Sequence, residues 1–385
     1  MANKRILIIS ANGDESTTGY ATRVLEIAKT LKNSGNTVKL LRFFPFHHPR
    51  SWNKNAQELG IELSELPMPP MSRFSLFRWA TVILANLLTY IVAKIWRADA
   101  LQAESHDAAL IALWIKWYAI PVLVDIHGAA PEEAEFLDRH SKKAKNRSWL
   151  QLAEKLIVEK SDIHFVVTQE MINHLQSKHT KIKSQAKILP VAVNLEFFPL
   201  LDTIQAKNNL GIPPDKTVVA YCGGDQNYQC LDDMKTVLEK LCGITNLHIL
   251  VISKSTEKFS TMFSSLPCSK TYVSANHDEV HKLLNAADYG LLIRRNELLN
   301  HVSCPTKFAE YLACGLAVLT TPWAGHGPSI VQHYKAGLVL DPDAIDCKAL
   351  EQLLQQRPDR SSLRKIATDN LSWSKASQTL IKCYL

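Results

Sequence analysis

The chain has 385 residues, of which 46% are hydrophobic and 21% are charged, and its formal net charge is +7. This length exceeds what one ordinary hydrophobic core organises, so we expect two domains. The basic excess is modest and excludes the dense basic stripe of a nucleic-acid-binding protein.

The first predicted elements form a strand, helix and second strand. An apolar run at residues 5–10 predicts a strand, a polar loop runs to Gly19, an amphipathic pattern predicts a helix over 20–33, and a second strand follows at 37–43. In open α/β sheets, ligands bind beyond the carboxyl ends of the strands. Gly19 therefore lies in a loop at the edge where a ligand is expected.

Residues 79–93 form an uncharged run between Arg78 and Lys94. A bilayer-spanning helix needs about 20 apolar residues, so we do not expect a span. The aromatic and basic flanks fit a helix lying at a lipid surface, and a helix packed on the core fits equally well. Two basic segments, 43–54 and 139–147, are either solvated or face an anionic membrane or a phosphate-bearing acceptor.

Further strands are predicted at 98–103, 122–126 and 164–168. Asp125 lies in the second of these, and His127 follows directly after it. His127 can hydrogen-bond a polar ligand with Asp125 orienting its ring, or it can be a structural histidine. Glu132 and Glu133 begin the next helix, where either can cap the helix or contact an acceptor.

The second half of the chain repeats the alternation of strand and helix. Strands are predicted at 217–222, 247–252, 289–293, 317–320 and 337–340, and a helix pair is expected over 363–385. Gly223 and Gly224 follow the first of these strands, so their N–H groups can approach phosphates. The pattern predicts a second doubly wound α/β domain.

One stretch near the end of that domain reads as strand, loop, short helix and strand. Arg294 ends the strand, and the helix that opens after Pro305 carries Lys307 and Glu310 near its start. Unpaired N–H groups at a helix start favour anions, so a nucleotide diphosphate suits this place. Alternatively, Arg294 is a solvated charge and Lys307 pairs with Glu310 along the helix.

From Glu310 the chain reads Glu-Tyr-Leu-Ala-Cys-Gly-Leu-Ala-Val. This order resembles the donor-binding signature of family 4 retaining glycosyltransferases, which have the GT-B fold. Val302 occupies the position of the first Glu in the family's Glu-x7-Glu pattern, so the likeness is to a variant branch. The resemblance implies two facing Rossmann-like domains with an interdomain cleft, at 1–195 and 196–365, and a C-terminal helix at 366–385 that returns to the first domain.

The resemblance also implies roles for the residues named above. Glu310 holds the donor ribose, and His127 with Asp125 lies near the anomeric carbon. The other donor-binding residues are Gly223, Gly224, Gln229, Arg294 and Lys307. Gln229 stands near the place where relatives carry a Lys. The first domain faces the acceptor in this family, which places Gly19, Glu132 and Glu133 on the acceptor side.

The expected reaction is transfer of a hexose from a nucleotide diphosphate sugar to a glycan, lipid-linked or small-molecule acceptor, with retention and without a metal or other cofactor. Asp341-Pro342-Asp343 spells a metal-binding Asp-x-Asp but is interpreted as a turn. Two alternatives stay open, a non-catalytic partner that binds nucleotide sugars and a GT-B nucleotide-sugar epimerase. Neither nucleic acid nor a metal is expected as a partner.

All eight cysteines lie beyond residue 220 and none forms a Cys-x-x-Cys pair. With no signal peptide before the first strand, they are interpreted as reduced thiols. We therefore expect a cytoplasmic protein, with the inner membrane face as a candidate surface for peripheral binding.

Overall fold

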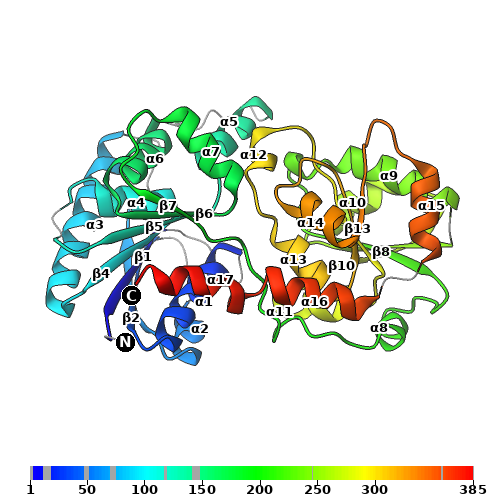
Figure 1. The fold of residues 1–385 in the computed structure, drawn as a ribbon, viewed down its shortest axis with the longest axis horizontal. Coiled ribbons are helices and arrows are strands. Elements are labelled where there is room, and N and C mark those ends of the chain that lie inside the picture. Colours follow the sequence, from blue (N-terminus) through cyan, green and yellow to red (C-terminus); the bar gives the residue numbers. More distant parts are fainter. Residues whose placement is uncertain are drawn as a thin grey trace. The chain divides into compact units, whose positions relative to one another are not determined.

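A computed structural model describes residues 3–11, 19–46, 52–69, 75–116, 119–140, 148–244, 246–356 and 359–384 (Figure 1). Residues 47–51 of the aromatic and basic segment and 141–147 of the basic run lie outside the described residues. The chain forms two compact units. The first unit is Met1–Pro190 with Ala376–Leu385, and the second unit is Val191–Lys375. The sequence-based prediction places the domain boundary after residue 195.

The first unit is built on a seven-stranded parallel sheet in the order β3-β2-β1-β4-β5-β6-β7. Its strands are β1 (Arg5–Ser10), β2 (Thr37–Pro45), β3 (Glu62–Met68), β4 (Ala100–Glu104), β5 (Val122–Ile126), β6 (Ile163–Val166) and β7 (Gln185–Ile188). Its helices are α1 (Gly19–Asn33), α2 (Asn53–Glu58), α3 (Ser75–Trp96), α4 (Ser105–Leu113), α5 (Ala130–His140), α6 (Ser148–Lys160) and α7 (Gln169–Lys178). Residues 6–9 of β1 are fully buried, as expected for a parallel strand covered on both faces.

The second unit has a six-stranded parallel sheet in the order β10-β9-β8-β11-β12-β13. Its strands are β8 (Thr217–Cys222), β9 (Leu247–Ile252), β10 (Ser269–Val273), β11 (Tyr289–Leu292), β12 (Ala317–Thr320) and β13 (Gly337–Val339). Its helices are α8 (Thr203–Asn209), the short η1 (Asn227–Gln229), α9 (Leu231–Ile244), α10 (Thr256–Met262), α11 (His277–Leu284), α12 (Leu298–His301), α13 (Thr306–Ala313), α14 (Gly327–Tyr334), α15 (Cys347–Gln355) and α16 (Arg360–Asn370).

The last helix, α17 (Trp373–Lys382), begins in the second unit and ends in the first. Near the end of the chain, the Tyr384 hydroxyl donates a hydrogen bond to the amide oxygen of Gln102 on β4. Both side chains are buried. This contact ties the C-terminal segment to the central part of the first sheet.

Strand order locates the ligand-binding edge of each unit. In the first sheet the order turns back between β1 and β4, and in the second between β8 and β11. At such a point the connections leave the sheet in opposite directions and open a crevice at the carboxyl ends of the strands. Two Rossmann-like units are thus present, each with its own predicted binding edge, and this confirms the expected fold class.

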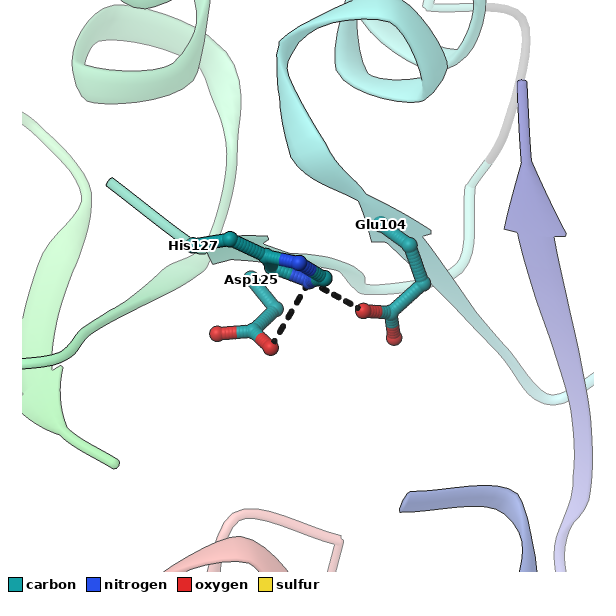
Figure 2. Close-up of side chains that lie close together, drawn as sticks. All are labelled: Glu104, Asp125 and His127. Atoms are coloured by element: carbon teal, nitrogen blue, oxygen red, sulfur yellow. Dashed lines mark hydrogen bonds and ion pairs between the residues drawn. The ribbon is translucent and has the colours of Figure 1, made fainter. Parts of the chain in front are cut away.

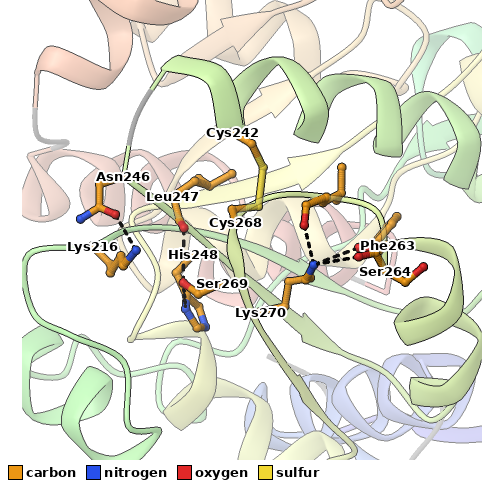
Figure 3. The surroundings of a disulfide bond; sticks show 11 residues. Lys216, Cys242, Asn246, Leu247, His248, Phe263, Ser264, Cys268, Ser269 and Lys270 are labelled. Carbon is orange, nitrogen blue, oxygen red and sulfur yellow. Dashed lines mark hydrogen bonds between the residues drawn. A yellow bond between two sulfur atoms is a disulfide. The ribbon is translucent and has the colours of Figure 1, made fainter.

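The structure corrects the prediction that every cysteine is a reduced thiol. Cys242, near the end of α9, and Cys268, just before β10, form a disulfide (Figure 3). Their Cα atoms are 5.7 Å apart, a separation usual for disulfides. Folding brings together a helix end and a strand start that show no paired motif in the sequence. The remaining cysteines are thiols: Cys222, Cys230, Cys304, Cys314, Cys347 and Cys383.

Within the described residues, α3 is the one helix whose length and composition would allow it to cross a membrane. The window Phe77–Trp96 has a mean hydropathy of 1.5, yet only a third of the residues in the tested window are buried. On its packed side, the Asn86 amide donates to the carbonyl oxygens of Ile111 and Ile115. One face of α3 therefore belongs to the fold, as one of the two sequence-based interpretations requires.

Candidate active site

His127 lies at the carboxyl end of β5 in the first unit, beside the last residue of β4 (Figure 2). Its Nε2 atom is 2.9 Å from Oε2 of Glu104 and 3.2 Å from Oδ2 of Asp125. Both carboxylates are fully buried, whereas the His127 side chain is 18% exposed. Among the described residues, no hydrogen bond reaches its Nδ1. As far as the described residues show, the second ring nitrogen can therefore bond to a ligand at the sheet edge.

Arg23 of α1 holds the second carboxylate of this group. Its Nε and Nη2 atoms donate to the two oxygens of Asp125 at 2.7 and 3.0 Å. Arg23 also donates to the carbonyl oxygens of Leu189 and Pro190. The planar guanidinium fits a carboxylate in this forked geometry, so it fixes the orientation of Asp125.

The charges in this cluster shift one another. Burial opposes protonation of His127, but Asp125 and Glu104 outweigh that effect and raise its pKa. Burial would raise the pKa of Asp125, yet Arg23 and then His127 hold it well below its usual range. Burial raises the pKa of Glu104. The arrangement favours a protonated imidazole beside an ionised Asp125, with Glu104 placed to share the proton.

Glu104, Asp125 and His127 are also the described residues whose ligand atoms lie close enough together, within 4.8 Å, to hold a metal ion. Both oxygens of Asp125 already accept hydrogen bonds from the Arg23 guanidinium. A metal cation here would have to lie next to that buried positive charge. The two carboxylates are therefore better suited to pairing with a protonated His127 than to binding a metal ion.

In the second unit, the side chain of Lys307 of α13 lies next to the turn that follows β8. Its Nζ donates to Oε1 of Gln229 at 2.9 Å and lies 4.4 Å from the ring centre of Tyr221. Burial, together with the positive charge of nearby Arg294, lowers the pKa of Lys307 to about 7. The partner of Lys307 is thus Gln229, and the alternative pairing with Glu310 is not the one that forms.

Arg294 lies just beyond β11, on the neighbouring strand of the same switch point. Its Nη1 donates to the carbonyl oxygen of Ile293 at 2.8 Å, and its guanidinium lies 5.8 Å from the ring centre of Tyr228. Arg294 is 4% exposed, so it is not the solvated strand-end charge of the alternative interpretation. Across the described part of the chain, neither Arg294 nor Lys307 forms an ion pair with a carboxylate.

Gly223, the first of the two glycines after β8, is engaged differently from the expectation. The N–H of Gly223 donates to the carbonyl oxygen of Ile252, so it is not available to a phosphate. Gly223 has a φ of +150°, and a Cβ there would lie 2.6 Å from Nζ of Lys307. Glycine suits this position because residues with a side chain rarely adopt such a φ. The carbonyl oxygen of Gly224 accepts from Tyr221.

Glu310 lies one turn after Lys307 on α13. Its Oε1 is 3.2 Å from Nε2 of His277, the first residue of α11. This hydrogen bond raises the pKa of His277, against the opposing effect of burial. The His277 side chain is 37% exposed, and Phe198 packs edge-on to its ring. A ligand that bonds to Glu310 can therefore either displace the partly exposed His277 or bond to the carboxylate alongside it.

The three residues assigned to the acceptor side are placed differently from one another. Gly19 begins α1, and apart from its chain neighbours no described residue places a heavy atom within 4 Å of where its Cβ would be. Glu133 is exposed in the first turn of α5. Glu132 is engaged: its Oε1 is 2.5 Å from Lys178 and 3.0 Å from His174. Burial would raise its pKa, but these hydrogen bonds lower it to about 2, so Glu132 links α5 to α7.

The Asp341-Pro342-Asp343 segment is a turn, as the sequence indicates. Asp341 accepts a hydrogen bond from the backbone N–H of Asp343. The Asp343 carboxylate pairs with Arg295 at 2.6 Å. The segment therefore serves a local turn and an ion pair.

Sequence reasoning missed Glu104, Arg23 and His277. Glu104 directly follows the predicted strand 98–103, at the expected ligand edge, so its position could have indicated it. Arg23 and His277 lie within helices and carry no local signal. Their roles depend on which strand ends lie next to each other in the sheet.

The family model of the glycosyl transferase 4-like domain matches residues 18–185, and that of glycosyl transferases group 1 matches residues 202–370. No curated protein sequence matches the chain significantly.

Several solved structures share the fold. Sucrose-phosphate synthase from Thermosynechococcus elongatus superposes with a TM-score of 0.75 at 17% identity, covering 99% of this chain and 98% of that one. A glycosyltransferase from Rickettsia africae gives 0.74 at 14% identity, covering 100% and 98%. HepE from Anabaena in complex with UDP and glucose gives 0.70 at 14%, covering 99% of each chain. From its two matched domains and its two Rossmann-like units, the chain is a glycosyltransferase of the GT-B fold.

Proposed function

We propose that the enzyme transfers a hexose from a nucleoside diphosphate sugar, with the diphosphate held by Arg294 and Lys307. The observation that carries this proposal is a pair of buried cations, close to one another at the switch point of the second unit, with no carboxylate paired to either among the described residues. Buried charges normally have a counter-charge. A diphosphate supplies one, and HepE, which shares the fold, was solved with UDP-glucose.

Glu310 supports the same proposal from the nucleoside end. A carboxylate can accept hydrogen bonds from both ribose hydroxyls, and it lies on the same helix as Lys307. In the reaction, the bond between the anomeric carbon and the diphosphate oxygen breaks and a bond to the acceptor oxygen forms. Arg294 and Lys307 would stabilise the negative charge of the leaving diphosphate. This cationic pair supports a reaction without a metal cofactor.

In the first unit, we propose that His127 contacts the transferred sugar or the acceptor, with Asp125 and Glu104 orienting its ring. We also propose retention at the anomeric carbon, a role in polysaccharide biosynthesis, and a glycan or lipid-linked acceptor used at the cytoplasmic face of a membrane. These proposals rest on the family likeness. The anomeric configuration of the product, read from proton couplings by NMR, tests retention.

The donor proposal is tested by incubating the protein with uridine, guanosine and adenosine diphosphate sugars and measuring released nucleotide. We expect slow hydrolysis of one donor class even without acceptor, undiminished by EDTA. Lys307→Met should abolish it, while Lys235→Met, a change on the surface of α9, should not. Binding of a nucleotide sugar without any turnover, with or without a panel of glycan acceptors, would point to the non-catalytic alternative.

A further inference from the structure

Six of the fifteen exposed large hydrophobic side chains among the described residues lie on α3. Its exposed large hydrophobic side chains are Phe77, Ile83, Leu84, Leu87, Ile91 and Ile95. Steps of three and four residues relate most of them, so they form one stripe along the helix. Ile95 is 80% exposed and Phe77 is 67% exposed. A contiguous apolar surface of this kind marks an interaction site.

The other face of α3 is committed to the protein. Val82, Ala85 and Thr89 are fully buried, and the Asn86 amide donates to two carbonyl oxygens in and beyond α4. Arg78 is also buried, against the ring of Trp149. A spanning arrangement would strip these contacts and expose polar groups to hydrocarbon. The apolar stripe is therefore built to lie on a surface and not to cross it.

The charges of α3 indicate the kind of surface. The helix contains no acidic residue, and its two charged residues are Arg78 and Lys94. Lys94 and the next basic residue, Arg97, are exposed at its C-terminal end. Asp99 beyond them accepts a hydrogen bond from the backbone N–H of Arg5. Lys94 and Arg97 against Asp99 leave a basic excess of one at this end of the stripe, which complements an anionic lipid headgroup layer.

Aromatic residues mark both ends of the helix. Trp79 lies near the first turn and stacks on Trp114 at 4.2 Å, and Trp96 closes the last turn beneath the guanidinium of Arg5. Both are half-buried. Tryptophan is enriched at the depth of lipid headgroups. In a pairing of two α3 helices, by contrast, the basic ends would meet no acidic residue of the helix.

We propose that α3 docks the first unit on an anionic bilayer, lying in the plane of the headgroups with its Phe77–Ile95 stripe in the acyl boundary. A helix of this length covers about 33 Å of that plane. Binding combines burial of the stripe with attraction of Lys94 and Arg97 to anionic headgroups. The proposal does not depend on the transfer reaction, since it concerns a surface and not the site.

The test is flotation of the purified full chain with vesicles of phosphatidylcholine alone or with about one third phosphatidylglycerol. We expect binding to the anionic vesicles that weakens at high salt and is released by alkaline carbonate. Leu87→Glu and Ile91→Glu should each lower the vesicle partition coefficient about tenfold. Ile204→Glu, at an exposed apolar residue of α8 in the second unit, should leave it unchanged.

Circular dichroism and donor hydrolysis establish that each variant remains folded. No flotation with either vesicle would overturn the proposal, and so would equal losses in the α3 and α8 variants. Self-association that Leu87→Glu abolishes, seen by analytical ultracentrifugation without vesicle binding, would assign the stripe to a second copy of the chain. Resistance to alkaline carbonate would show a spanning helix instead of an in-plane one.

Discussion

Glu104 and His127 come from neighbouring strands of the first sheet and meet through Oε2 and Nε2 at 2.9 Å. The carboxylate is fully buried, and its second oxygen accepts from the amide of Gln102 at 2.7 Å. With Asp125 at 3.2 Å from the same ring nitrogen, His127 has two acidic neighbours, and no described residue forms a hydrogen bond with its Nδ1. The ring is therefore held in one orientation at the ligand edge.

Glu104→Gln should lower the pKa of His127, because the substitution removes a negative charge while keeping an acceptor oxygen. We expect kcat/KM to fall roughly tenfold and the pH profile to shift toward lower pH. Histidine chemical shifts followed by NMR titration measure the pKa directly. Glu154→Gln, which alters a second buried pair with His179 at 2.9 Å, is the matched control. A His127 pKa unchanged by Glu104→Gln would contradict the pairing.

Arg23→Met should leave the buried Asp125 carboxylate without its forked partner. Removing one member of a buried ion pair costs about 3 kcal/mol or more of unfolding free energy, and urea titration measures this. The lowered pKa of Asp125 determines how the stabilisation by this pair changes with pH. The pair stabilises the fold above the unfolded pKa of an aspartate, and that stability is lost as the pH falls through the folded value. The variant should lose less stability than wild type on acidification.

Nucleotide binding should depend on pH through Lys307, whose pKa is about 7 in the empty site. A bound diphosphate favours the ammonium form, so binding takes up a proton and the affinity weakens as the pH rises above 7. Calorimetry in buffers of different ionisation enthalpy measures the uptake. His277 also lies nearby with a raised pKa, so His277→Gln serves as the control. Proton uptake that persists in Lys307→Met and vanishes in His277→Gln would assign the dependence to the histidine.

Glu310→Ala should weaken binding of the free nucleotide by about 2–3 kcal/mol, the range for hydrogen bonds to a charged group. Isothermal titration calorimetry with the nucleoside diphosphate measures this. With the corresponding 2′-deoxynucleotide, the difference in affinity between wild type and Glu310→Ala should be smaller, because one ribose hydroxyl is absent. Glu297→Ala, at the N-cap of α12 in the same unit, is a comparison carboxylate. Equal affinities of wild type and Glu310→Ala would limit Glu310 to its contact with His277.

The disulfide between Cys242 and Cys268 closes a loop with a sequence separation of 26. The chain-entropy relation gives about 3 kcal/mol of stabilisation for such a loop. Under oxidising conditions, Cys242→Ser should therefore unfold at a lower denaturant concentration than wild type. Under reducing conditions, the two proteins should have nearly the same midpoint. Intact mass with and without reductant reports the bond. An equal midpoint for oxidised and reduced wild type would show that the bond does not stabilise the fold.

The sequence by itself determined most of the two sheets and part of the proposed donor site. Central parallel strands are covered on both faces, so their sequences are continuous apolar runs. The predicted bounds agree with the structure for β1, β5, β8, β9 and β12. Edge strands β3 and β10 were missed because one side of each is open and its residues are mixed in polarity. The order after β11 likewise placed Lys307 and Glu310 on one short helix.

Tertiary structure alone decided which residues meet. Arg23 reaches Asp125 across a sequence separation of 102, and Lys307 reaches Gln229 across 78. Cys242 and Cys268 meet because the α9 end and the β10 start lie side by side. Local patterns carry propensity and periodicity, which set the elements, but strand order brings distant strand ends to one edge. The apolar stripe of α3 is likewise exposed because the opposite face of the helix packs against the protein, which the sequence alone does not determine.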